Sequence, residues 1–329
     1  MDYTSGSGFA IIINEQRRIA ACKFSSDPRK LVGSRASVPK RRIDYEHACA
    51  AVYHKLGLSA FVHNALTSDY LIEQYFDSGL YDIEPEKEAA DANASKRRSR
   101  KVHPTYKKLV KEFRKYQDTY ETQKKEDGQF ADKKIVRLKD MLCFLDKNTK
   151  FRETFENTLD SENISDLMAI WYVGYQRDMH GSNILLKFTD SGKIYMHGFD
   201  FEHSLEERFA PLGARCVTEV RAPEFLRISA VQRMEFSKTV IEKLGKANTE
   251  EITAIITRII PRFATALPNE LTNIIQRISR LNEFASSSRN STLLKLYNSL
   301  TDESVHPAPS TKMTFGQAWP EIRRDDWVR

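Results

Sequence analysis

Cysteine is scarce in this sequence. Four cysteines occur in 329 residues, far apart, at Cys22, Cys49, Cys143 and Cys216. They form no C-x-x-C pair or other spacing that would seat zinc, which excludes a zinc site built on clustered cysteines. We therefore expect free thiols and a reducing compartment.

Long hydrophobic runs are also absent. Nowhere do about 18 apolar residues follow one another, as a membrane-spanning helix requires. The N-terminus lacks the basic flank and the apolar run of a signal peptide. We expect a monomeric, cytoplasmic protein that has no transmembrane segment. Its length fits two unequal parts that share one active site.

Positive charge is concentrated in one part of the chain. The net charge is +6, yet residues 96–140 hold sixteen Lys or Arg against seven Asp or Glu, so the remainder is slightly acidic. Such an excess indicates an anionic partner, unless it is only a solvated helix face. We expect an inositol polyphosphate or an anionic lipid headgroup; nucleic acid is disfavoured because aromatic residues that could stack on bases are few here. The expected binding residues are Lys96, Arg97, Arg98, Arg100, Lys101, Lys107 and Lys108, with Lys111 beside them.

The residue patterns predict four parts. Residues 1–80 read as a small β-rich part with one helix, because two strands (9–14 and 19–24), a helical stretch ending at Gly57 and two further strands follow in order. The other three parts are a charged helical region, a mainly helical region and an extended tail, at residues 81–150, 151–301 and 302–329. Within the third part, two helices are predicted at 248–267 and 268–284, and a hairpin turns at Thr189-Asp190-Ser191-Gly192.

Polar residues on either side of this hairpin suggest phosphoryl transfer from ATP. The segment Asp178-Met179-His180-Gly181-Ser182-Asn183 precedes the hairpin, and Asp200 follows it. Phosphoryl transfer needs oxygen ligands for Mg²⁺ (or Mn²⁺) and a carboxylate at the acceptor hydroxyl. We expect Asn183 and Asp200 to hold the metal, because a tight hairpin would bring them together. Asp178 would orient the acceptor or take its proton.

These motifs resemble those of the protein-kinase superfamily. Arg177, Asp178 and Asn183 stand at the spacing of its catalytic loop, and Asp200-Phe201 resembles its metal-binding motif. The resemblance implies an α+β bilobal protein-kinase-like fold, with a small β-rich N-lobe that has one helix and a larger, mainly helical C-lobe. It also implies further ATP-binding residues: Gly6, Ser7 and Gly8 over the phosphates, Lys23 on a strand, Glu46 on the helix as its partner, and Glu73 in the hinge strand 71–76.

The substrate class is open, because two kinds of kinase share features with this chain. Arg221-Ala222-Pro223-Glu224 resembles the end of a protein-kinase activation segment and favours an atypical Ser/Thr protein kinase. His180 instead resembles the D-x-H-x-x-N pattern of aminoglycoside, choline and phosphoinositide kinases, although a residue that braces the loop is the preferred interpretation. Gln176 and Glu202 replace a histidine and a glycine of the protein-kinase motifs.

The sequence leaves two further hypotheses about function. A pseudokinase that binds nucleotide or a partner without turnover is supported only by the short glycine-rich segment. The mixture of motifs also resembles the remodelled kinases that intracellular bacterial pathogens secrete into the host cytosol, some of which depend on a host inositol polyphosphate. That resemblance implies a protein substrate and an inositol polyphosphate activator.

Overall fold

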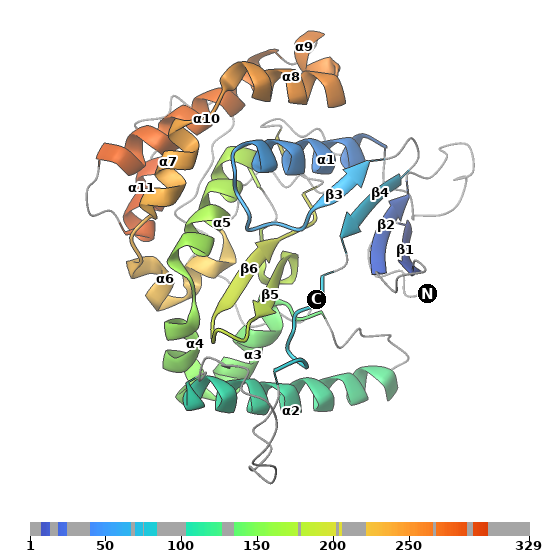
Figure 1. Cartoon of the computed structure of the whole chain (residues 1–329), viewed down its shortest axis with the longest axis vertical. Coiled ribbons are helices and arrows are strands. Elements are labelled where there is room, and N and C mark those ends of the chain that lie inside the picture. Colours follow the sequence, from blue (N-terminus) through green and yellow to red (C-terminus); the bar gives the residue numbers. More distant parts are fainter. Residues whose placement is uncertain are drawn as a thin grey trace, which may run out of the picture.

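The chain is a mixed α+β protein that is mostly helical, as the computed structural model shows (Figure 1). The structure describes residues 8–13, 19–24, 40–66, 70–74, 76–83, 103–126, 135–176, 179–201, 204–205, 222–265, 268–287 and 292–301. Among these, no helix is long and apolar enough to cross a membrane.

A four-stranded antiparallel sheet forms the N-terminal part. It consists of β1 (Gly8–Ile13), β2 (Ile19–Phe24), β3 (Asn64–Leu66) and β4 (Tyr70–Gln74), in the order β1-β2-β4-β3. The predicted hairpin and the two later strands are confirmed.

Helix α1 (Lys40–Lys55) lies between β2 and β3 in the sequence and packs on β3 and β4. Its end at Gly57 is confirmed. The residue has a φ of 71°, and the Leu58 amide donates to the Tyr53 carbonyl at 3.0 Å. This is the left-handed glycine stop of a helix, which only glycine adopts without steric cost.

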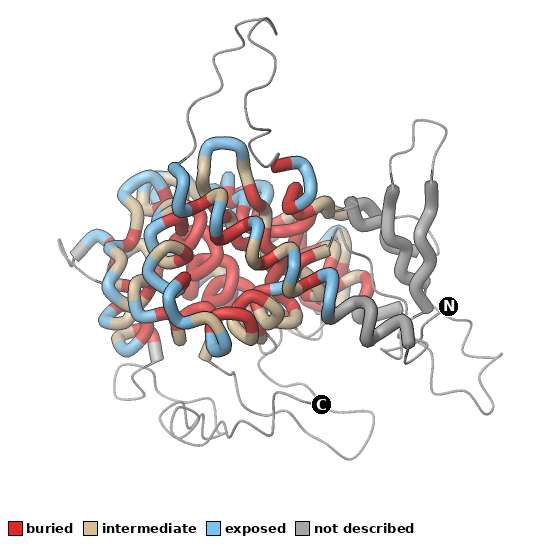
Figure 2. Tube along the Cα trace, turned by 90° about the horizontal axis from the view of Figure 1, so that it is seen from below, coloured by how far each residue is buried: buried red, intermediate tan, exposed pale blue. Residues whose placement is uncertain are grey.

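One helix in the middle of the helical part (Figure 1) is almost entirely buried. That helix is α5 (Ser161–Gly174), of whose 14 residues the 12 from Asn163 onward are buried. A helix that is buried on every side belongs to the core, and Figure 2 shows the buried residues gathered in the middle of the helical part. The other helices of this part are α2 (Pro104–Glu126), α3 (Leu138–Lys147), α4 (Arg152–Thr158), α6 (Ser229–Arg233), α7 (Lys238–Gly245), α8 (Thr249–Ile259), α9 (Arg262–Thr265), α10 (Pro268–Ser287) and α11 (Leu293–Thr301).

Helix α2 contributes to the same core. Its Tyr106, Leu109, Val110 and Phe113 are buried within the main hydrophobic cluster, while Lys108 is exposed. The charged composition of this segment therefore describes only the outer face of an amphipathic helix.

The helix predicted at 248–267 is interrupted, which corrects the expectation of one continuous helix. Helix α8 ends at Ile259 and α9 begins at Arg262. Pro261 lies between them and has no amide hydrogen to continue the helical hydrogen bonds. The start of the next helix at Pro268 is confirmed.

The second sheet is the predicted hairpin. Strands β5 (Ile184–Phe188) and β6 (Ile194–Gly198) pair antiparallel, with Ile184 opposite Gly198. Gly192 in the turn has a φ of 79°, the left-handed conformation that the sequence predicted for it.

Candidate active site

The hairpin brings Asn183 and Asp200 to the same end of one ladder. Asn183 lies in the 3-10 turn η3 (Gly181–Asn183) directly before β5, and its carbonyl accepts a hydrogen bond from the Phe199 amide at 3.2 Å. Asn183 is buried. Asp178 and the neighbouring Arg177 lie outside the described residues. The carboxylate predicted to orient the acceptor hydroxyl is therefore not placed.

The loop before Asn183 is held by its own polar groups. His180 accepts a hydrogen bond through Nδ1 from the Ser182 amide at 3.1 Å, and its carbonyl accepts one from the Asn183 amide at 2.8 Å. A histidine that caps a turn in this way fixes the backbone around it. The observed contacts are those of the bracing role that the sequence favoured for His180.

Asp200 has a backbone conformation that few residues other than glycine adopt. Its φ is 61°, in the left-handed region where residues other than glycine are uncommon. Such a conformation costs about 1–3 kcal/mol and is frequent at functional sites, where the surrounding structure imposes it. The strain identifies Asp200 as a residue held in place by its neighbours.

One of those neighbours is Glu46. Its side chain is buried, 1% exposed, and Oε1 accepts a hydrogen bond from the Phe201 amide at 3.4 Å. The Phe201 ring meets the Tyr53 ring edge-on, with centroids 5.4 Å apart. Helix α1 therefore contacts the segment that carries Asp200 through a carboxylate and an aromatic ring.

Lys23 is described by its backbone alone. In the register of the sheet it lies opposite Phe9 on β1 and Leu71 on β4. Position 23 therefore belongs to the same face of the sheet as position 64. Asn64 is the only one of these whose side chain is described, and its Oδ1 lies 2.9 Å from His47 Nδ1 on α1. Position 23 is thus on the face that α1 covers.

Glu73 shares that face by the same register, since it lies opposite Ala21 and Asn64. Gly8 opens β1, whereas Gly6 and Ser7 lie outside the described residues.

Gln176, which replaces the expected histidine, lies at the centre of a buried polar network. Its Nε2 donates to the Tyr53 hydroxyl at 2.6 Å, and its Oε1 accepts from the Ser204 hydroxyl at 2.6 Å. Burial raises the pKa of the nearby Cys49 thiol to about 12, and burial also raises the pKa of Tyr53 well above its usual value. The network therefore stays uncharged near neutral pH and joins α1 to the segment after Asp200 by hydrogen bonds.

The chain after β4 is anchored to the hairpin, which the sequence analysis did not predict. The Ser78 carbonyl accepts from the Phe188 amide at 2.7 Å, and the Asp77 carbonyl accepts from Lys187 Nζ at 2.5 Å. Gly79 has a φ of 66°, and a Cβ at this position would lie 2.8 Å from the Phe188 carbonyl oxygen. The glycine after a predicted hinge strand was the available sign of this close approach.

The predicted polyanion site is placed only in part. Lys96, Arg97, Arg98, Arg100 and Lys101 lie outside the described residues. Lys108 and Lys111 are exposed on α2, and Lys107 is half-buried there.

The described residues contain no group of three or more His, Cys, Asp or Glu that could hold a metal ion. The candidate metal ligands are an amide and a carboxylate, Asn183 and Asp200, both of which offer the oxygen donors that Mg²⁺ prefers. The donor set fits magnesium and does not fit zinc.

Comparison with known proteins leaves the family open. No family model matches the sequence, and no curated protein matches it. Among solved structures, the open conformation of CtTel1 aligns with 89% of this chain at 15% sequence identity and a TM-score of 0.36. The chain spans 11% of that CtTel1 chain, and a likeness of this size carries no argument about function.

Proposed function

We propose that this chain is an ATP- and magnesium-dependent phosphotransferase with a bilobal kinase-like fold. The observation that carries the proposal is the junction at Asp200. A strained aspartate follows a hairpin that begins at Asn183, and the next amide is bound by the buried carboxylate of Glu46. Strained and buried polar residues that converge from distant parts of a chain are typical of an active site.

Each residue would have a distinct task. Asn183 and Asp200 would hold magnesium, which when bound neutralises charge on the phosphate oxygens. Lys23 would bind the phosphates, and Glu46 on α1 would orient it, because position 23 lies on the sheet face that α1 covers. Asp178 would orient the acceptor hydroxyl and take its proton.

The acceptor is proposed to be a Ser or Thr of a protein. Glu224, which ends the segment that resembles a protein-kinase activation segment, lies beside the loop that leads to Asn183: its amide donates to the Met179 carbonyl at 3.1 Å. The histidine pattern that favours a small-molecule or phosphoinositide kinase has a structural explanation here, because His180 caps η3.

Incubation of the purified chain with ATP and magnesium tests the proposal. We expect magnesium-dependent release of ADP and phosphorylation of Ser or Thr on the chain or on a generic protein substrate, detected by mass spectrometry. Transfer to an inositol lipid and not to protein would identify the alternative substrate class. ATP binding without turnover under any metal would contradict the proposed reaction and identify a pseudokinase.

A further inference from the structure

Glu224 joins a remote segment to the loop that ends in Asn183. It begins the 3-10 turn η4 (Glu224–Arg227), 43 residues after Gly181. Its amide donates to the Met179 carbonyl at 3.1 Å, and its Oε2 accepts a hydrogen bond from the Gly181 amide. Two hydrogen bonds in opposite directions therefore fasten the two segments together.

This contact supplies the acceptor for the first amide of η3. The first amides of a helical turn have no partner within the turn. In η3, the Ser182 amide is bound by the His180 ring and the Asn183 amide by the His180 carbonyl. The Gly181 amide is bound by Glu224. A hydrogen bond to a carboxylate is stronger than one between neutral groups, so Glu224 is well suited to hold this turn.

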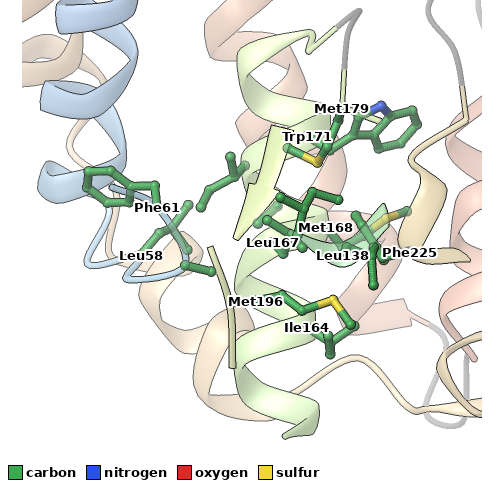
Figure 3. Packing of buried hydrophobic residues seen from close by; sticks show 14 of the residues in the cluster. Leu58, Phe61, Leu138, Ile164, Leu167, Met168, Trp171, Met179, Met196 and Phe225 are labelled. Atoms are coloured by element: carbon green, nitrogen blue, oxygen red, sulfur yellow. The ribbon is translucent and has the colours of Figure 1, made fainter. Parts of the chain in front are cut away.

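The packing around Gly181 leaves no room for a side chain. A Cβ there would lie 2.7 Å from Glu224 Oε2 and 3.0 Å from the Lys139 amide nitrogen at the start of α3. The loop is therefore confined between Glu224 and α3. The neighbours Met179 and Phe225 are both buried, and Figure 3 shows them beside residues of α5.

We propose that Glu224 is a positioning residue for the loop that carries Asn183. By binding the Gly181 amide it fixes η3, and so makes the placement of the metal ligand Asn183 depend on the docking of residues 222–227. This inference rests on the proposed phosphotransferase function, and it adds a connection between two segments that the proposed reaction does not itself require.

Three variants test this role. Glu224→Ala removes the acceptor, and Glu224→Gln keeps an oxygen at the same distance from the backbone. Arg227→Met removes the ion-pair partner of Glu224: in the wild type, Arg227 Nη1 lies 3.1 Å from Glu224 Oε1. We expect Glu224→Ala to lower kcat roughly tenfold or more, the loss that removal of a charge-assisted hydrogen bond produces. It should also raise the magnesium concentration for half-maximal rate. Glu224→Gln should recover most of both quantities, and Arg227→Met should behave as wild type.

A purely structural role would lower the thermal stability of Glu224→Ala without changing its magnesium dependence at temperatures where it is folded, and that result would overturn the proposal. Equal losses in Glu224→Ala and Arg227→Met would also overturn it, because the ion pair would then be the important contact.

Amide hydrogen exchange separates this inference from the proposed reaction. In the absence of nucleotide, we expect faster exchange at residues 179–183 in Glu224→Ala than in wild type or Arg227→Met. Unchanged exchange would overturn the positioning role. If the wild type lacks turnover and exchange at residues 179–183 is still faster in Glu224→Ala, the proposed phosphotransferase reaction is contradicted, whereas the positioning role of Glu224 is supported.

Discussion

Asp200 is expected to bind magnesium, and its backbone also adopts an energetically costly conformation. Its φ of 61° is one that alanine adopts poorly, whereas asparagine tolerates it better than most residues. A variant at this position can therefore lose activity for two reasons, a missing carboxylate or a displaced backbone. Paired variants separate them.

We predict that Asp200→Ala and Asp200→Asn both lose magnesium-dependent turnover, by about 100-fold or more, because each lacks the charged oxygen ligand that would hold the magnesium ion, and that ion would neutralise the phosphates. Asp200→Asn should keep the wild-type melting temperature, since it preserves the shape and the left-handed backbone. Steady-state kinetics and thermal denaturation measure the two effects. Full turnover in Asp200→Asn would remove Asp200 from the metal site.

A second residue-scale prediction concerns Gly79. We expect Gly79→Ala to lower the free energy of unfolding by about 1–3 kcal/mol, because the residue has a positive φ and its Cβ would lie 2.8 Å from a carbonyl oxygen. Gly245→Ala is the matched control: Gly245 ends α7, and among the described residues its Cβ would meet Asn282 alone, at 3.7 Å. Chemical denaturation should show less than about 1 kcal/mol of change there. Equal effects in both variants would show that the strain at Gly79 is not what costs stability.

At the scale of elements, α1 is held from two directions. On one side, Glu46 and Tyr53 contact the segment at Phe201. On the other side lie α8 and α9: the Phe263 ring meets Tyr45 edge-on at 5.8 Å, and Lys55 forms an ion pair with Glu251. The ion pair is exposed and contributes little, so the buried rings are the important contact.

We predict that Phe263→Leu lowers kcat for the proposed reaction, because an edge-to-face pair contributes about 0.5–1.5 kcal/mol beyond the area it buries and its loss loosens α1. A fall of roughly threefold is expected. Phe155→Leu serves as the control, since Phe155 is equally buried but lies on α4, away from α1.

Both variants should lose similar stability, measured by denaturation, while only Phe263→Leu changes kcat. A parallel change in kcat for both would show that the effect is general destabilisation.

At the scale of the whole molecule, stability should depend on pH through His197. Burial lowers the pKa of this imidazole from 6.5 to about 4. The unfolded chain therefore binds a proton at a higher pH than the folded one, and stability falls as the pH drops from about 6.5 to about 4. The full effect is up to about 3 kcal/mol, and it levels off outside this window.

Replacement of His197 by phenylalanine, which can still pack on the neighbouring Phe76 ring 5.1 Å away, should flatten the pH dependence in that window. Denaturant titrations at pH 7.5, 6, 5 and 4.5 measure it. His63, whose pKa burial also lowers, remains in both proteins, so the difference between them isolates His197. An unchanged slope would show that His197 is not the titrating group.

The uneven charge is the other property of the whole molecule, and it predicts a polyanion ligand. We expect inositol hexakisphosphate to bind with an affinity that falls as salt rises, because the contacts are electrostatic. Replacing the five cations between Lys96 and Lys101 with glutamine should abolish this binding in calorimetry. A control lowers the net charge equally at exposed sites elsewhere, at Lys150, Lys238, Lys246, Arg258 and Lys295. Equal loss in both would indicate that only net charge matters.

The sequence by itself determined the local features of this protein. The apolar residues of β5 and β6 and the glycine at 192 were sufficient for the hairpin, and the hairpin places Asn183 beside the segment of Asp200. Helix stops at Gly57 and starts at Pro268 follow from single residues. Pro261 was a sequence signal for the interruption between α8 and α9, although the helical spacing of apolar residues on either side of it predicted one continuous helix.

Only the tertiary structure decided the contacts between distant segments. The Glu46 carboxylate reaches an amide 155 residues away, Gln176 binds a hydroxyl 123 residues away, and Glu224 binds an amide 43 residues away. A buried polar group must find a partner wherever the fold supplies one, and no periodicity along the chain encodes which segment that is. The same holds for α8 and α1, whose pairing follows from how their apolar faces meet around the shared core.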